Sequence, residues 1–354
     1  PGRPGAHDPL AAARKRAWRE LRVEPLTVEE RGRMITAYLA RFSKKLDDHR
    51  LARLASARPA ANPLYLKILL DDLRVTGTHD RLDERLTEYL AACDIPALLK
   101  QVLARYRREY DRDRPHLVAE ALGLIYAARR GLSETELLHL LRPADRPQLP
   151  PALWTPLRAA LEDSLVDRDD VLNFAHDYLR AAVEAAFAAD ADRRKTLRLR
   201  LADYFEAQPI TARTCDELPW LLKEADSPVR LRACLLHIDR FLLIKERDEE
   251  ELRRYWIEPL HEQQTMGKAY LESFETWSQG PLCRDSGVSY AANELGLFLL
   301  RAALHAEAEP FLRRSLEIDE RSFGKDHPKV AIRLGNLAQL LEATNRLAEA
   351  EPLM

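Results

Sequence analysis

Apolar residues recur every three or four positions over most of this chain, which places them on one face of successive α-helices. In the first such helix, Thr27 and Glu30 have the spacing of a capping box, and the apolar face runs on to Leu46. After a loop, Asn62 and Pro63 are expected to cap and begin the next helix, since proline is favoured at the first helical position. Further helices are predicted over residues 81–91, 95–110, 114–129, 134–141, 154–165 and 178–205.

Two short segments break the helical period. Residues 18–26 alternate apolar and polar side chains up to Pro25, which predicts a strand. Residues 166–174 hold a charged turn, DRDD, between two apolar runs, and they predict a two-stranded wing. Helices followed by such a hairpin make residues 113–205 a predicted winged-helix domain.

The end of the chain repeats itself. The sequence AEAEP at residues 306–310 recurs 42 residues later, at 348–352, and Leu295 aligns with Leu337 in the same way. A period of about 40 residues with paired amphipathic helices predicts a helical solenoid. Four small residues are expected to let the paired helices approach closely: Gly296, Ala308, Ala338 and Ala350.

Composition supports a mainly helical chain. Leu, Ala, Arg and Glu are abundant, and glycine accounts for only 12 of the 354 residues. The predicted fold class is therefore all-α, with a helical domain, a winged-helix domain that carries a small β-wing, and then an α-solenoid.

The balance of charge argues against nucleic acid and membranes as partners, and the cysteines indicate the redox compartment. The 55 basic and 57 acidic side chains nearly balance, so no general field attracts nucleic acid or an anionic membrane. The wing holds three aspartates against one arginine, which disfavours DNA binding through the third helix. No apolar run approaches the roughly 20 residues of a membrane helix. Four widely spaced cysteines without a CxxC pair predict reduced thiols in a cytoplasmic protein.

Motifs for catalysis are missing from the sequence. A phosphate-binding loop reads GxxxxGK[ST], but Gly267-Lys268 is followed by Ala and Gly324-Lys325 by Asp. The sequence also holds no HExxH metal motif and no GxSxG nucleophile motif. This chain is therefore predicted to be no enzyme and to bind no metal.

Several segments nevertheless resemble signalling NTPases of the STAND class, the NACHT and NB-ARC proteins. The sequences NPLYLKILLDDLR at 62–74 and ARRGLSETELLHLL at 128–141 resemble nephrocystin-type NACHT proteins. LNFAHDYLR at 172–180 resembles the strand and helix start that end their winged-helix domain, although Ala175 stands where many relatives have Met. Residues 308–354 are similar to tetratricopeptide repeats (TPRs) of kinesin-light-chain type.

This resemblance implies a nucleotide switch in a longer protein. An upstream nucleotide-binding domain would hold ATP or ADP with Mg²⁺, and that longer protein would be an ATPase. The family histidine, here His176, contacts the β-phosphate of ADP, and the family proline, here Pro63, packs against the adenine. Asp177 and Arg180 would support the switch, and the repeats would bind a protein or peptide on their concave face. Oligomerisation that depends on nucleotide is a further expectation.

The resemblance also implies a domain order. Residues 1–26 would be a linker and the last strand of the nucleotide-binding domain, followed by a helical domain (27–112), the winged helix (113–205), a helical connector (206–285) and TPR units (286–354), with more repeats to follow. Two alternatives stay open. In the first, His176 and Asp177 are a helix cap without a ligand, and Pro63 is only a helix start. In the second, the whole chain is a scaffold that needs no nucleotide.

Overall fold

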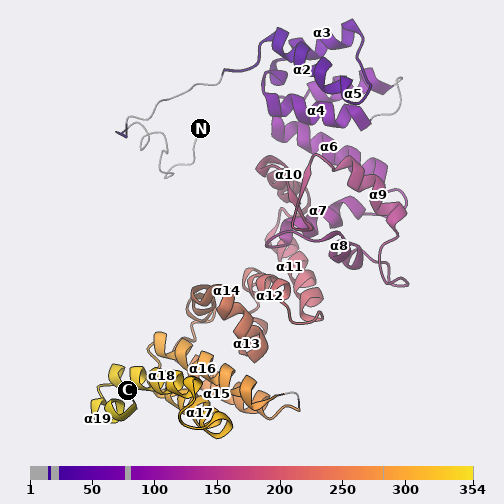
Figure 1. Cartoon of the computed structure of the whole chain (residues 1–354). Helices are drawn as coiled ribbons and strands as arrows, with labels where there is room; N and C mark the ends of the chain where they lie inside the picture. The colour runs from indigo at the N-terminus through magenta and orange to yellow at the C-terminus, as the bar shows by residue number, and fades with distance from the viewer. Residues whose placement is uncertain (1–14, 17–23, 76–80, 282, 354) are drawn as a thin grey trace. The chain divides into compact units, whose positions relative to one another are not determined.

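The computed structural model describes residues 15–16, 24–75, 81–281 and 283–353 (Figure 1). It divides into two compact units, Pro1–Glu109 and Tyr110–Met354, which are described separately. Most of the strand predicted over 18–26 lies outside the described residues, and 24–26 form no strand.

The first unit is a cluster of helices whose starts follow the predicted caps. Thr27 and Glu30 form the expected capping box. Asn62 Oδ1 accepts the Leu64 N–H at 2.9 Å, and Pro63 begins the helix after it. The elements are α2 (Val28–Ala40), α3 (Asp48–Ser56), η1 (Arg58–Ala61), α4 (Pro63–Val75), α5 (Leu82–Leu90) and α6 (Ile95–Tyr110).

The prediction that the first helix continues to Leu46 was wrong. Helix α2 ends at Ala40, and Ser43 has a φ of +54°, which is incompatible with a continuous helix. The segment predicted as a loop contains α3 instead. Its start is fixed by Asp47, whose Oδ1 accepts the Arg50 N–H at 2.8 Å.

A charged network lies inside the first unit. The side chains of Asp72 and Arg105 are both buried and form an ion pair, and Tyr89 donates its hydroxyl to Asp72. Arg105 also reaches Glu109 at 2.6 Å. Each buried charge thus has a partner, as charges in an apolar interior require.

The second unit begins with helices and a hairpin. They are α7 (Leu117–Ala127), α8 (Glu134–Leu140), α9 (Pro151–Ala160), β1 (Leu165–Arg168), β2 (Val171–Phe174) and α10 (Asp177–Phe187). The predicted wing is confirmed as an antiparallel pair in which Arg168 lies opposite Val171. Asp169 and Asp170 both have positive φ, the geometry of a two-residue type I′ turn. Helix α9 is shorter at its end than the predicted 154–165.

Gly131 joins this hairpin to the helix before it. Leu132 exchanges two backbone hydrogen bonds with Leu172, at 3.2 and 2.9 Å, and so extends the edge of β2. Gly131 has a φ of +99°, and a Cβ at this position would lie 2.1 Å from the Leu172 carbonyl oxygen. Only glycine fits this turn without strain.

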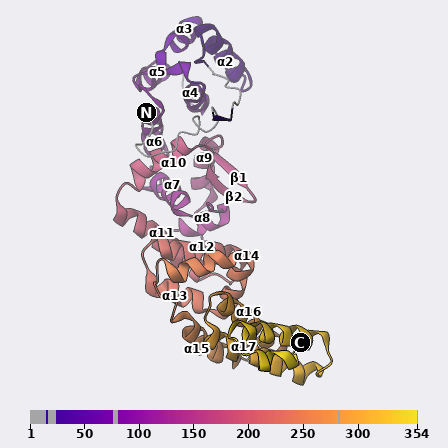
Figure 2. The same ribbon diagram turned by 90° about the vertical axis from the view of Figure 1, so that its left-hand side faces the viewer.

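The rest of the second unit is a stack of helix pairs. The helices are α11 (Ala191–Glu206), α12 (Ala212–Glu224), α13 (Pro228–Leu236), α14 (Ile238–Ile257), α15 (Met266–Ser278), α16 (Asp285–Arg301), α17 (His305–Phe323), α18 (Pro328–Ala343), α19 (Leu347–Ala350) and η3 (Glu351–Leu353). Contacts run from α12 to α14, α16 and α18 in one series, which we call the A layer. A second series, the B layer, runs from α13 to α15 and α17. Figure 2 shows α14 and α16 on one side of the stack and α13 and α15 on the other.

Aromatic rings fill the space between the two layers. Phe241 and Phe298 from the A layer both pack against Tyr270 of the B layer, with centroids 5.1 and 6.2 Å away. The predicted close helix contacts are also present, since a Cβ on Gly296 would lie 2.6 Å from the Leu312 side chain. Within the described residues, no helix combines the length and the apolar character needed to cross a membrane.

Candidate functional site

The predicted switch residue His176 lies between the hairpin and a helix. Strand β2 ends at Phe174, and His176 occupies the N-cap position of α10. Its side chain is exposed and makes no capping hydrogen bond, and Asp177 is exposed in the first helical turn. The imidazole is therefore at a cap position without acting as the cap.

Arg180 is engaged within the protein. Its Nη2 donates to the Tyr126 carbonyl oxygen at 3.1 Å, and its guanidinium lies over the Tyr126 ring, 4.7 Å from the centroid. These contacts attach α10 to the end of α7. Arg180 thus fixes α10, whose N-cap is His176.

The four predicted site residues fall in different units. His176, Asp177 and Arg180 come together at the start of α10 in the second unit. Pro63 is exposed at the start of α4 in the first unit.

The A layer carries a second candidate site that the sequence reasoning missed. Tyr290 on α16 is 49% exposed and Ile332 on α18 is 59% exposed. The two positions are 42 residues apart, the same interval as the AEAEP repeat, so they are equivalent in successive units. Large apolar side chains exposed on neighbouring elements are typical of interaction surfaces. The repeat period could have identified this pair.

Polar side chains fix the surroundings of Tyr290 and Ile332. Asn336 Nδ2 donates to Asn293 Oδ1 at 2.7 Å, which links α18 to α16. Lys245 Nζ lies 2.5 Å from a Glu294 carboxylate oxygen, which links α14 to α16. Partial burial, together with the nearby carboxylates of Glu294 and Glu246, raises the pKa of the Tyr290 hydroxyl. The phenol is therefore neutral at neutral pH, and charged groups surround it.

A buried carboxylate joins the stack to the turn after α7. Glu217 of α12 is fully buried, and its two oxygens accept the backbone N–H groups of Arg129 and Arg130, each at 2.9 Å. Arg213 adds a contact of 2.7 Å. Burial raises the pKa of Glu217, while the charge of Arg213 and the two N–H groups oppose that shift. The sequence showed no sign of this contact, which spans more than 80 residues.

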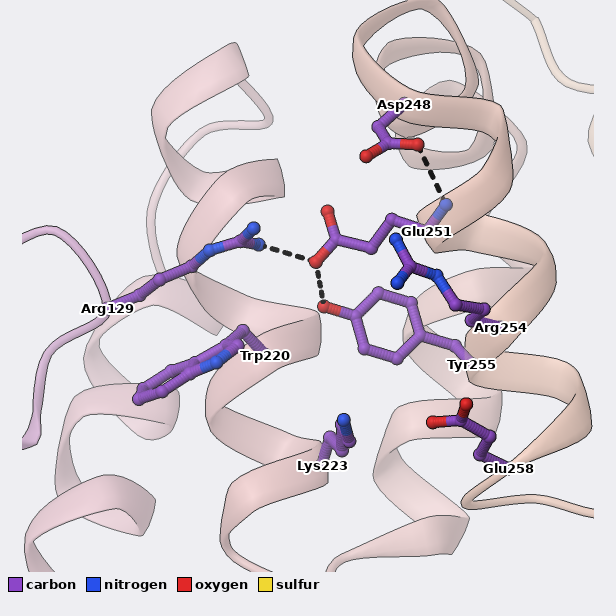
Figure 3. Close-up of a pocket in the computed structure, with 8 residues that line it drawn as sticks. All are labelled: Arg129, Trp220, Lys223, Asp248, Glu251, Arg254, Tyr255 and Glu258. Carbon is purple, nitrogen blue, oxygen red and sulfur yellow. Dashed lines mark hydrogen bonds and ion pairs between the residues drawn. The ribbon is translucent and has the colours of Figure 1, made fainter. Parts of the chain in front are cut away.

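A pocket of about 300 Å³ opens next to this joint (Figure 3). Within it, Arg129 forms a 2.8 Å ion pair with Glu251, and the Tyr255 hydroxyl donates to Glu251 at 2.7 Å. Helix α14 is broken at Asp248, where φ is −161° and ψ is 92°, and Asp248 Oδ1 caps the following turn. The lining residues are Arg129, Trp220, Lys223, Asp248, Glu251, Arg254, Tyr255 and Glu258.

Metal-binding chemistry finds no support in the described ranges. They contain no group of three or more His, Cys, Asp or Glu side chains placed to hold an ion. All four cysteines are free thiols, and Cys215 and Cys234 are buried.

Comparisons with known proteins match this architecture. Residues 288–354 match the tetratricopeptide repeat family. The chain is 29% identical to a TPR repeat-containing protein of Dictyostelium discoideum over 69% of its own length and 15% of the relative's. It is 28% and 27% identical to nephrocystin-3 of Mus musculus and Homo sapiens, over 96% of its length and 26% of theirs.

The chain thus spans about a quarter or less of the relatives it matches. The matched repeat region coincides with α16 to α19, where the layered packing and the exposed pair on the A layer are found. Residues 288–354 are therefore a tetratricopeptide-repeat protein-interaction region, and the chain is homologous to TPR-containing proteins that include nephrocystin-3.

Proposed function

We propose that this chain is the regulatory and protein-interaction region of a STAND signalling NTPase, and that a protein partner binds through an extended segment laid across the A layer. The observation that carries the binding role is the exposed pair Tyr290 and Ile332, repeated on adjacent helices. Apolar side chains of the partner would cover this pair, because their removal from water is favourable.

The polar neighbours suit the backbone of such a segment. Among the described residues, no donor bonds to Asn336 Oδ1, while Asn336 Nδ2 is held by Asn293. This fixed oxygen can accept a peptide N–H from the partner. Fixed polar groups lose little side-chain entropy on binding, which favours affinity.

A selection experiment tests this role. Random linear peptides displayed on phage are selected on the wild-type chain, on a Tyr290→Asp, Ile332→Asp double variant, and on Val229→Asp. Val229 is 81% exposed on α13 in the B layer, so it is a matched exposed apolar site off the proposed surface. We expect enrichment on the wild type and on Val229→Asp only. Equal enrichment on the double variant would contradict the proposal.

The nucleotide role rests on the free imidazole of His176. An imidazole beside a helix start offers a hydrogen-bond donor, backbone N–H groups and a favourable dipole to a phosphate. We infer that His176 contacts the β-phosphate of ADP held by an upstream domain with Mg²⁺, while Pro63 packs against the adenine. Exchange for ATP would release this clamp through a shift in population. The contacts of Arg180 with Tyr126 support a fixed helix start.

This part is tested in a longer protein that includes the nucleotide-binding domain. His176→Ala should weaken ADP retention and raise basal activity, because the phosphate loses a donor. His49→Ala is the control, since His49 is exposed near the start of α3. Unchanged ADP retention in His176→Ala would favour the alternative, a TPR scaffold that works without nucleotide.

A further inference from the structure

A buried arginine has no partner at the place where α12, α13 and α14 pack together. Arg240 lies in the first turn of α14 and keeps only 8% of its surface exposed. Its Nε is buried and has no hydrogen-bond partner. Among the described residues, no carboxylate pairs with its guanidinium and no oxygen accepts from Nη1 or Nη2. A buried charge is costly unless it is paired, so this arginine calls for an anion.

The thiols around Arg240 cannot act as that anion. Cys215 of α12 and Cys234 of α13 are both buried. Burial raises the pKa of both thiols, and the nearby charge of Arg240 only opposes that rise. Both thiols are therefore uncharged at neutral pH, and the guanidinium beside them stays without a counterion.

Two carboxylates near this corner have other partners or face away from it. Glu206 acts on the Cys234 thiol but is paired with Arg230 at 2.6 Å. Asp239 is exposed, and its Oδ2 lies 3.8 Å from His237 Nδ1. Burial and the charge of the arginine lower the pKa of His237, so this imidazole is neutral at neutral pH. None of these groups neutralises the buried guanidinium.

The start of α14 brings further donors to the same place. The N-cap His237 makes no capping hydrogen bond, so the N–H groups of the first turn, from Ile238 on, lack a cap. A helical side chain leans toward the N-terminus of its helix, which directs Arg240 toward these N–H groups. The action of its charge on His237 agrees with that direction. Guanidinium and helix start thus offer donors from two sides.

We propose that Arg240 and the first turn of α14 bind a phosphate group at the corner of α12, α13 and α14. The guanidinium presents two parallel N–H groups to two phosphate oxygens. The uncapped helix start serves the other oxygens through its N–H groups and its dipole. A carboxylate has only two oxygens and would leave part of these donors unused. Occupation neutralises the buried charge and ties the first helices of the stack together, independently of the proposed function.

Thermal unfolding of the full chain with inorganic phosphate tests this site, at an ionic strength held constant with sodium chloride. Arg240→Met replaces the arginine with an uncharged side chain of similar length. Arg314→Met is the control, because it removes the charge of an exposed arginine on α17. Phosphate should raise the melting temperature of the wild type and of the control saturably, by about 2 °C or more. Arg240→Met should not respond.

The same variant tests whether the arginine is truly unpaired. In buffer without phosphate, Arg240→Met should be at least as stable as the wild type, since it removes an unpaired buried charge. A large loss of stability would show that the arginine has a partner within the chain, and would overturn the proposal. An absent response of the wild type would overturn it too, as would equal responses of all three proteins, which mark a general salt effect.

Two further probes define the ligand. Sodium acetate at the same concentrations should stabilise the wild type less than phosphate does, and an equal effect would overturn the assignment to phosphate. O-phosphoserine separates two sources of the group. A response to it that requires Arg240 indicates a phosphorylated peptide, and a response to inorganic phosphate alone indicates the free ion.

Discussion

One buried side chain, Glu217, determines how the turn after α7 is held. Both carboxylate oxygens are occupied, by the backbone N–H groups of Arg129 and Arg130 and by Arg213. Removing the carboxylate would leave the two backbone N–H donors without an acceptor, and Arg213 would keep only Glu136 and the Gly131 carbonyl oxygen. Such a loss costs several times more than an exposed ion pair.

We therefore expect Glu217→Ala to lower the free energy of unfolding by about 3–5 kcal/mol. Glu246→Ala, an exposed glutamate on α14, should change it by less than about 0.5 kcal/mol. Urea denaturation followed by circular dichroism measures both variants. A similar small effect of the two substitutions would show that Glu217 does not hold this joint.

The cysteines should differ strongly in reactivity. Burial raises the pKa of the Cys234 thiol to about 12, and burial also raises that of Cys215, whereas Cys93 is exposed. Because the thiolate is the nucleophile, iodoacetamide at neutral pH should label Cys93 first. Peptide mass spectrometry of timed samples follows each site. Labelling of Cys234 as fast as Cys93 in the folded chain would disprove its burial.

Local patterns predicted single residues well where their partners are close in sequence. The caps at Thr27 and Asn62 were predicted because each bonds to an N–H two or three residues later. Glu217 could not be predicted, since its partners lie 87 and 88 residues upstream. For His176 the sequence predicted a position at a helix start, and its contact with nucleotide stays a prediction.

At the scale of elements, the turn between α7 and α8 depends on Gly131. Gly131→Ala should destabilise the chain by more than about 2 kcal/mol, because the added Cβ meets the Leu172 carbonyl and φ is positive. Gly335→Ala is the matched control: it lies inside α18, and a Cβ there meets nothing within 4 Å. This control should stabilise by about 0.5–1 kcal/mol. Thermal unfolding of the two variants gives the comparison, and equal melting temperatures would contradict it.

The packing of α11 on α7 should depend on pH. Burial alone would raise the pKa of Glu120, but hydrogen bonds and charges from Arg114 and Arg200, at 3.0 and 3.1 Å, lower it overall. A lowered pKa in the folded state stabilises the chain above the ordinary glutamate pKa. This contribution is lost as the pH falls through the lowered value.

Glu120→Gln should accordingly lower the free energy of unfolding by about 1 kcal/mol at neutral pH, a modest value because the site is partly exposed. In acid, where the carboxyl is protonated in the folded and unfolded states, the variant and the wild type should converge. Urea denaturation at both pH values measures the difference. A gap that persists in acid would assign the effect to packing rather than to charge.

Element boundaries were predicted less well than element types. The helices predicted up to Leu46 and over 154–165 both end earlier in the structure. The spacing of apolar residues continues past the point where each helix ends, so periodicity alone placed the ends too late. Asp47 begins a new helix that the periodicity alone did not separate. The wing was predicted correctly, since two short apolar runs around DRDD admit few other structures.

At the scale of the whole chain, the sequence repeat predicted the solenoid only over the residues in which a motif recurs. The units after residue 288 share a 42-residue interval, and their packing followed from it. Helices α12 to α15 stack in the same two layers without a recurring motif, so only their contacts place them in the array. The surface that carries Tyr290 and Ile332 is a property of this stack rather than of one helix.

The dissociation constant of the best selected peptide tests the central claim, binding across the A layer, most directly. Isothermal titration calorimetry of one peptide is done with three proteins: the wild type, the double variant Tyr290→Ala/Ile332→Ala, and the control Val229→Ala. We expect the two substitutions at Tyr290 and Ile332 to weaken binding by about tenfold or more, as the loss of hot-spot residues at the centre of an interface does. Val229→Ala should leave the affinity unchanged. Equal affinity for the double variant and the wild type would show that the partner binds elsewhere.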